Sequence, residues 1–214
     1  MFGLFKRGSR PKPPNYLVWK NDASRWEGIW KSVAGRTGDG RLLFIAHFDE
    51  TLAMLHELLE QEGMVAESLE RAYQPSDLCR LPPGIYVAHA SRLDEQTTNR
   101  DTSSNTPLKI IAIEPHLMPE PDGELKQALV AIRGDVLFEH HASLDDLPLR
   151  IFAGERTLEL LSNAGFEEGD CLNSGMVSRA IRRAQTKLSE MPGIDREVTS
   201  LKAWEAQLPE TDGR

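Results

Sequence analysis

The chain has little cysteine and no long apolar run, and each absence excludes a class of protein. Only Cys79 and Cys171 occur among the 214 residues. Two thiols so far apart, without a CxxC motif, provide neither a disulfide framework nor a cysteine-based zinc site. No stretch reaches the roughly 20 apolar residues that a membrane-spanning helix needs. The N-terminus does not resemble a signal peptide, because its charges follow its first apolar residues. We therefore expect a cytoplasmic protein.

The chain also has fewer basic than acidic residues. The chain carries 33 acidic against 25 basic residues, which gives a formal net charge of −8. Nucleic-acid-binding domains normally have a basic excess, so we expect no nucleic-acid partner. The hydrophobic share of 40% and the charged share of 27% are those of an ordinary globular protein. The length suits one α/β domain with tails.

A phosphate-binding loop of the GxxxxGK[ST] type is missing. Gly35 and Gly40 have the glycine spacing, but Arg41 and Leu42 stand where Lys and Ser/Thr should contact phosphate and Mg²⁺. This loop also precedes a predicted strand instead of following one. A GxSxG nucleophile pattern is missing as well. The first absence argues against a nucleotide hydrolase that works alone, and the second gives no sign of a serine nucleophile.

What the sequence does contain is an alternation of strand and helix patterns. Apolar runs predict strands at 16–19, 41–48, 64–69, 84–90, 108–113 and 136–139. Helical periodicity predicts helices at 22–33, 49–63, 124–132, 149–161 and 174–188. Proline in 73–83 and polar, hydroxyl-rich residues in 94–107 predict irregular loops. The alternation predicts a parallel sheet with helices on both faces.

Three regions follow from these patterns. Residues 1–14 are a flexible basic tail, residues 15–191 form the domain, and residues 192–214 form a loosely packed or disordered end that carries Trp204. The basic tail has a second interpretation. Apolar side chains among basic ones within residues 1–12 could make a weak peripheral contact with the inner face of a membrane.

The segment from Ser143 to Leu188 carries the most specific pattern. Its pieces are Ser-Leu-Asp-Asp at 143–146, Arg-Ile-Phe-Ala-Gly at 150–154, Gly-Phe-Glu-Glu at 165–168 and Met-Val-Ser-Arg-Ala-Ile at 176–181. This order resembles the end of the second nucleotide-binding domain, the helicase C-terminal-like domain, of the SecA preprotein translocase family. The resemblance covers roughly residues 16–191. It implies a three-layer RecA-like α/β fold with degenerate motifs.

The resemblance also implies where the family's nucleotide contacts would fall. The family's Gly-Arg-Gly-Thr-Asp stretch corresponds to Ala88–Asp94, in which Arg92 and Asp94 remain and both glycines are gone. The family's Glu-Arg-His corresponds to Glu114 and His116. These residues imply at most a vestigial nucleotide site.

The family's three arginine-finger positions fall on Lys126, Ala128 and Ala131. Losing even one arginine finger typically lowers the rate by about 10³–10⁵. The resemblance therefore implies that the chain has no ATPase of its own and needs no cofactor, with weak binding of ATP or ADP as the alternative.

The predicted helix after Ser174 has a basic face. Its members are Arg179, Arg182, Arg183 and Lys187. This face is either a solvated surface or a protein interaction surface. The resemblance favours an interaction or regulatory protein linked to protein export, with SecA or other translocon components as partners. An alternative is a nucleotide-binding subunit that completes an ATPase site in trans. The sequence leaves the oligomeric state open.

The remaining polar clusters predict no catalytic or metal site. His116, His140 and His141 could suggest a metal, but adjacent residues in a strand point to opposite faces. The pairs Asp145–Asp146 and Glu167–Glu168 fit the N-terminus of a helix and a solvated loop better than a pair of catalytic carboxylates. We therefore expect no metal.

Overall fold

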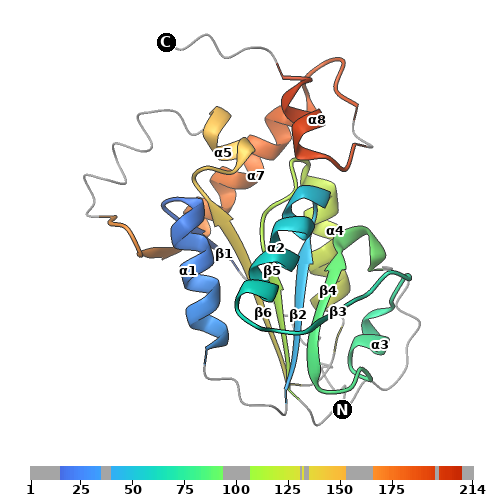
Figure 1. Cartoon of the computed structure of the whole chain (residues 1–214). Helices are drawn as coiled ribbons and strands as arrows, with labels where there is room; N and C mark the ends of the chain where they lie inside the picture. Colours follow the sequence, from blue (N-terminus) through green and yellow to red (C-terminus); the bar gives the residue numbers. More distant parts are fainter. Residues whose placement is uncertain are drawn as a thin grey trace, which may run out of the picture.

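The computed structural model describes residues 15–34, 40–93, 107–130, 132, 135–152, 166–195 and 198–208. Figure 1 shows a central sheet with helices packed around it and with α8 beyond one end of the strands. The tail of residues 1–14 and most of the predicted 94–107 loop lie outside the described residues.

The described strands form one seven-stranded sheet in the order β3-β4-β2-β5-β6-β1-β7. Their bounds are β1 Tyr16–Trp19, β2 Arg41–Ala46, β3 Ala66–Ser68, β4 Gly84–His89, β5 Leu108–Ala112, β6 Val136–Ser143 and β7 Cys171–Asn173. The first six run parallel, whereas β7 pairs antiparallel with β1 at the edge. The predicted parallel sheet is confirmed.

The helices are α1 Asp22–Val33, α2 Asp49–Gln61, α3 Pro75–Leu78, the 3₁₀ turn η1 Ala90–Arg92, α4 Pro119–Val130, α5 Leu147–Phe152, α7 Gly175–Ser189 and α8 Leu201–Glu205. The side chain of Ser174 caps α7 by accepting a hydrogen bond from the Met176 N–H, which satisfies a donor at the helix end. The rest of the helix predicted at 149–161 lies outside the described residues.

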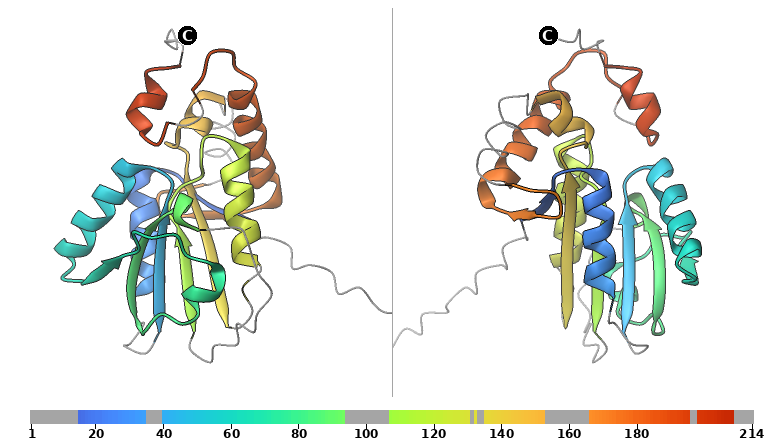
Figure 2. Two further views of the ribbon diagram at one scale, coloured as in Figure 1. Left: turned by 90° about the vertical axis from the view of Figure 1, so that its right-hand side faces the viewer. Right: turned by 60° about the vertical axis from the view of Figure 1, so that its left-hand side comes forward.

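Two apolar layers hold the helices against the sheet, one on each face. On one face, Ile29 of α1 and Leu55 of α2 pack against Phe44 and Ile111. On the other face, α4 packs against alternate residues of the same strands, such as Leu43 and Ile110. Figure 2 shows this three-layer arrangement, with α4 and α7 opposite α1 and α2.

Strand β6 continues to Ser143, four residues past the end that the sequence predicts. The short strand β7, later in the chain, is not among the predicted strands. The apolar run stops at Glu139 because the next two positions are histidines. Both are nonetheless buried, His140 at 0% exposure and His141 at 1%. Their side chains turn to opposite faces: His140 packs against Tyr16, and His141 accepts a hydrogen bond from the Trp19 indole. The prediction of opposite faces is confirmed.

Helix α4 begins at Pro119, five residues before the predicted start at Glu124. Pro119 and Pro121 suggest a break in the sequence, but proline is tolerated in the first turn of a helix, where its missing N–H has no helical partner. This earlier start places Asp122 inside the first turn, where it is 2% exposed.

The end of the chain packs more firmly than its sequence suggests. Residues 192–214 are polar and predict a loose end, yet Trp204 of α8 is completely buried. It lies in a cluster with Phe48, Leu117 and Leu188. Its indole N–H donates a 2.8 Å hydrogen bond to the Val198 carbonyl. This burial and this hydrogen bond help to hold residues 198–208 against the domain.

Candidate functional site

The order of the strands marks one end of the sheet as the place for a site. From β2 the chain passes through α2 to β3 on one side, and from β5 it passes through α4 to β6 on the other. The connections diverge between β2 and β5, which are neighbours. In open parallel sheets, ligands bind at such a switch point, beyond the carboxyl ends of the strands. The segments there are the one after β2, with His47 and Phe48, and the one after β5, from Ile113 to Met118.

Asp122 is the centre of a buried polar cluster below this crevice. It accepts hydrogen bonds from the Tyr16 hydroxyl, from the backbone N–H of His116 at 2.8 Å and from the Gln185 amide at 2.7 Å. The three donors come from β1, from the segment after β5 and from α7. Charge-assisted bonds of this kind are the strong ones, so Asp122 joins three parts of the fold.

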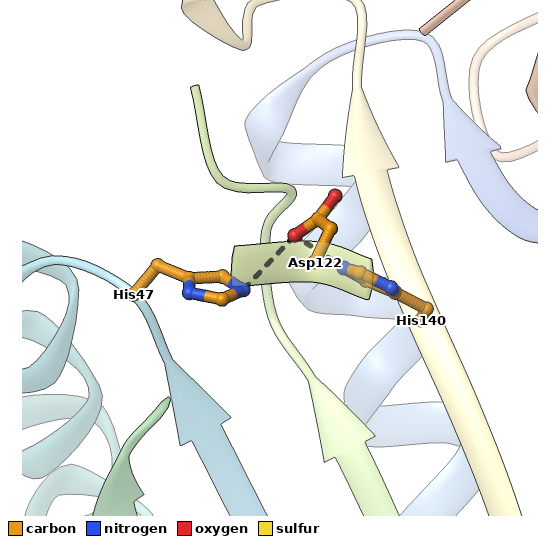
Figure 3. Close-up of side chains that lie close together, drawn as sticks. All are labelled: His47, Asp122 and His140. Atoms are coloured by element: carbon orange, nitrogen blue, oxygen red, sulfur yellow. Dashed lines mark ion pairs between the residues drawn. The ribbon is translucent and has the colours of Figure 1, made fainter. Parts of the chain in front are cut away.

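Two imidazoles approach the same carboxylate, as Figure 3 shows. His47 Nε2 lies 3.0 Å from Asp122 Oδ1, and His140 Nε2 lies 3.9 Å from the same oxygen. His140 Nε2 also lies 3.2 Å from the Glu114 carbonyl oxygen. The three side chains belong to the segment after β2, to α4 and to β6.

Burial controls the charges in this cluster. Burial lowers the pKa of His140 to about 3 and the pKa of His116 to about 4, so both rings are neutral at physiological pH. Burial by itself would raise the pKa of Asp122, but the neighbouring imidazoles of His140 and His47 hold it below its usual range. The cluster therefore combines an ionised carboxylate with the neutral rings of His140 and His116.

A second buried charge pair lies on the α1 side of the crevice. Arg25 is 3% exposed and donates a 2.7 Å hydrogen bond to Asp146 at the start of α5. It also lies 3.0 Å from Asp22. Burial raises the pKa of Asp146 to about 7, against the opposing effect of Arg25. Glu114 accepts a 2.7 Å hydrogen bond from the His47 N–H, and burial raises its pKa as well.

A cavity of about 280 Å³ lies over these groups. Its acidic lining residues are Asp22, Glu50, Glu114, Asp145, Asp146 and Glu205, and its basic ones are Arg25 and Arg150. Arg25 is paired with Asp22 and Asp146, and Arg150 is paired with Glu205. A nucleotide triphosphate needs a positive or amide-lined cradle. The charged residues of this lining are mostly carboxylates, and both arginines are already paired, so the lining does not provide one.

The end of the chain covers the same crevice. Glu50, in the first turn of α2, accepts hydrogen bonds from the Ser200 hydroxyl and from the Leu201 N–H at 2.9 Å. Burial would raise the pKa of Glu50, but these bonds lower it to about 2. The ring centre of Trp204 is 6.5 Å from that of His116. Residues 198–208 thus occupy space beyond the strand ends, where Figure 1 shows α8.

The nucleotide residues implied by the sequence do not meet on an open surface. Glu114 at 4%, His116 at 8% and Lys126 at 5% exposure lie in or beside the buried cluster. Arg92 is exposed in η1, and Asp94 lies outside the described residues.

Two of the three positions that correspond to the family's arginine fingers are part of the interior. Lys126 Nζ lies over the Tyr16 ring at 3.6 Å from its centre, and burial lowers its pKa to about 8. Ala128 packs in the core at 2% exposure. Ala131 is not among the described residues.

Sequence reasoning missed the residues that build the cluster. His47, Asp122 and Gln185 are single polar residues in three separate segments. The only signal was a polar side chain at an apolar position of a helix, as for Gln185, which is completely buried in α7.

The predicted basic face of α7 is present and exposed. Arg179, Arg182, Arg183 and Lys187 line one open hollow together with Thr186. The opposite side of the helix is buried through Ile181, Ala184 and Leu188. The structure therefore brings these four basic residues together on one surface. Within the described residues, no helix combines the length and apolar character that crossing a membrane requires.

Comparison with known proteins places the chain beside SecA. It is 43% identical over 190 residues to protein translocase subunit SecA of Nitratiruptor sp., a match covering 82% of this chain and 21% of that protein. It is 33% identical over 183 residues to SecA of Christiangramia forsetii, covering 81% and 16%. With SecA of Sulfurimonas denitrificans it shares 23% over 188 residues, covering 84% and 22%. The chain spans about a fifth of the length of these relatives.

No family model matches the chain. Among solved structures, the C-terminal part of the Fun30 ATPase domain aligns with a TM-score of 0.40 and 14% identity, covering 78% of this chain and 54% of that one. A TM-score of 0.40 is too low to support a conclusion about this chain. The sequence matches and the three-layer parallel sheet together identify the chain as a SecA-like domain with a RecA-like fold.

Proposed function

We propose that this SecA-like chain is an interaction or regulatory protein linked to protein export, and that it has no ATPase of its own. The observation that carries the proposal is the exposed basic face of α7 in a protein whose net charge is −8. A local surface of the opposite sign to the whole molecule selects acidic partners and orients them. SecA or another translocon component that presents an acidic surface is the proposed partner.

The crevice supports the second half of the proposal. Its charged lining residues are mostly carboxylates, its two arginines are paired, and residues 198–208 cover it. The alanine at position 128 is a core residue, and Lys126 is held against Tyr16. A transition state of phosphoryl transfer needs cations aimed at the developing charge, and these residues do not supply them.

The test of the partner is a cross-linked pull-down from the native host, read by mass spectrometry. We expect SecA or translocon components to be recovered with the wild-type chain. The triple variant Arg179→Glu, Arg182→Glu and Arg183→Glu should lower the affinity for the recovered partner at least tenfold. The matched control carries Lys20→Glu, Lys31→Glu and Arg80→Glu, which make the same change of net charge at exposed positions elsewhere. Equal binding by both variants would remove α7 as the interaction surface.

Nucleotide measurements separate this proposal from an ATPase site completed in trans. We expect the purified chain to release phosphate no faster than a protein-free blank and to show no saturable binding at millimolar ATP or ADP. Binding that Arg92→Ala abolishes would favour the trans alternative, because Arg92 is the exposed member of the implied set. Phosphate release above the blank would overturn the absence of an ATPase.

A further inference from the structure

The buried cluster at the switch point has the composition of a metal site. One nitrogen from His47, one from His140 and one oxygen from Asp122 all lie within 4.8 Å of one another. Figure 3 shows both rings directed toward the carboxylate. Two imidazoles and one carboxylate are a common protein donor set for divalent transition metals.

The distances fit a small tetrahedral ion. Zinc binds imidazole nitrogen and carboxylate oxygen at about 2.0–2.2 Å, so ligand atoms of a tetrahedral site lie about 3.3–3.5 Å apart. The His47 and His140 nitrogens lie 3.0 and 3.9 Å from Asp122 Oδ1, which brackets that spacing. Each of these two distances is within about 0.4 Å of that range.

An unpartnered buried nitrogen is the second, independent observation. His47 is 3% exposed, and its Nε2 has no partner with hydrogen-bond geometry among the described residues. It nevertheless points at Asp122 Oδ1 from 3.0 Å. A buried polar atom in a native structure is normally satisfied, so an exception calls for a bound group that completes it. A metal ion between the two atoms would do so.

The groups around the three ligands suit a metal as well. Asp122 Oδ2 is held by the Tyr16 hydroxyl and the Gln185 amide, which fixes the direction of the carboxylate. Outer hydrogen bonds of this kind orient ligands in metal sites.

We propose that His47, Asp122 and His140 bind a divalent transition-metal ion of the zinc class, with the Glu114 carbonyl or a water as the fourth ligand. The ion joins the segment after β2 to α4 and β6, three parts of the chain that are far apart in sequence. It is a structural ion, because all three ligands are at most 3% exposed. The inference does not depend on the proposed export role, since none of the three ligands belongs to the basic face of α7.

The first experiment measures binding by the wild-type chain. The protein is produced without a histidine tag, stripped with a chelator and titrated with Zn²⁺ and with Co²⁺. We expect one equivalent to bind, and the Co²⁺ complex to show tetrahedral d–d absorption without a thiolate charge-transfer band. At 100-fold excess over the dissociation constant, Zn²⁺ should raise the thermal midpoint by about 5–10 °C.

The second experiment assigns the ligands. Asp122→Asn preserves the shape of the side chain, and His47→Gln and His140→Gln keep a polar group in place. Each should weaken Zn²⁺ binding at least 100-fold. His56→Gln, at an exposed histidine of α2, and Cys171→Ser, at the exposed thiol, should leave it unchanged. Circular dichroism of each chelated variant shows whether it is folded.

The wild-type titration tests the metal site even if a ligand variant does not fold. Less than 0.1 equivalent of bound metal, with no cobalt spectrum and no shift of the midpoint, overturns the site. Binding that survives in the folded ligand variants, or that is lost in His56→Gln or Cys171→Ser, also overturns it, because the ion is then held at the surface.

Discussion

The crevice and the outer face of α7 are both charged, but they differ in sign, burial and pairing. In the crevice, Arg25 and Asp146 are buried and bonded to each other, and Asp122 is surrounded by donors. On α7, Arg179, Arg182 and Arg183 stand exposed around an open hollow. The first region uses charge to join elements of the fold. The second leaves charge on the surface, where a partner can reach it.

The physics of the two settings is different. Breaking a buried pair leaves a charge without water or a partner, which costs about 3–5 kcal/mol. An exposed charge keeps its water, so its contribution to stability is small and is screened by salt. Substitutions in the crevice should therefore act on folding, and substitutions on the basic face of α7 should act on binding alone.

The largest effect is expected where the chain's own end covers the crevice. Trp204→Ala removes a fully buried indole from the cluster around Phe48 and Leu188, together with its hydrogen bond to Val198. We expect a loss near the upper end of about 3–5 kcal/mol in the free energy of unfolding. Urea denaturation followed by circular dichroism measures it. Trp204→Phe, which keeps most of the apolar volume, should lose much less.

An unchanged stability in Trp204→Ala would change the contrast between the crevice and α7. If Trp204→Ala unfolds at the wild-type urea concentration, residues 198–208 are a removable cover and the crevice is open in solution. The loose end expected from the sequence would then be the better description.

Removing Arg25 should cost somewhat less. Arg25→Met leaves Asp146 buried without its partner, and the expected loss is near the lower end of about 3–5 kcal/mol. The loss is limited because burial already raises the pKa of Asp146 to about 7, so the carboxyl can take up a proton instead of staying charged. The double variant Arg25→Met, Asp146→Leu should recover most of the loss. Lys31→Met, which breaks the exposed pair with Glu27, is the control.

An unchanged stability in Arg25→Met would contradict the crevice side of the comparison. Urea unfolding at pH 5 and pH 7.5 adds a second check. The penalty in Arg25→Met should be smaller at pH 5, where the lone carboxyl is protonated.

The next effect depends on pH. The pKa of Glu50 is lowered from 4.5 to about 2 by its bonds to Ser200 and Leu201. A lowered carboxyl pKa stabilises the fold above the unfolded value and loses that contribution as the pH falls toward the folded value. The thermal midpoint of wild type should therefore approach that of Glu50→Gln between pH 4.5 and pH 2.

The control for this prediction is Glu57→Gln, an exposed residue on the same helix. Its difference from wild type should stay small across the range. A constant gap between wild type and Glu50→Gln would mean that the contact with residues 200–202 does not form in solution.

Residues with a periodic pattern could be predicted from the sequence, and isolated residues could not. The strands β2, β4 and β5 are continuous apolar runs, and α7 repeats apolar residues at helical spacing, so their places followed from local physics. The end of β6 did not, because His140 and His141 look polar until Asp122 and Trp19 are seen beside them.

The site was harder to predict for a reason of topology. His47, Asp122 and His140 meet only because β5 lies between β2 and β6 and because α4 crosses over that part of the sheet. Strand order is not encoded in any local pattern. Trp204 shows the same limit: one aromatic residue in a polar segment gives no periodicity, although it is completely buried.

The smallest effect on folding is expected on α7. Replacing Arg179, Arg182 and Arg183 by alanine should leave the urea midpoint unchanged, although Ile181 on the opposite side of the same helix is fully buried. Arg182 even opposes the charge of the buried Lys126, so its loss relieves a repulsion. The same variant should bind the export partner less tightly, and the difference from wild type should shrink as salt is added. A clear fall in the urea midpoint would mean that the basic face stabilises the domain, and the contrast between a folding region and a binding region would no longer hold.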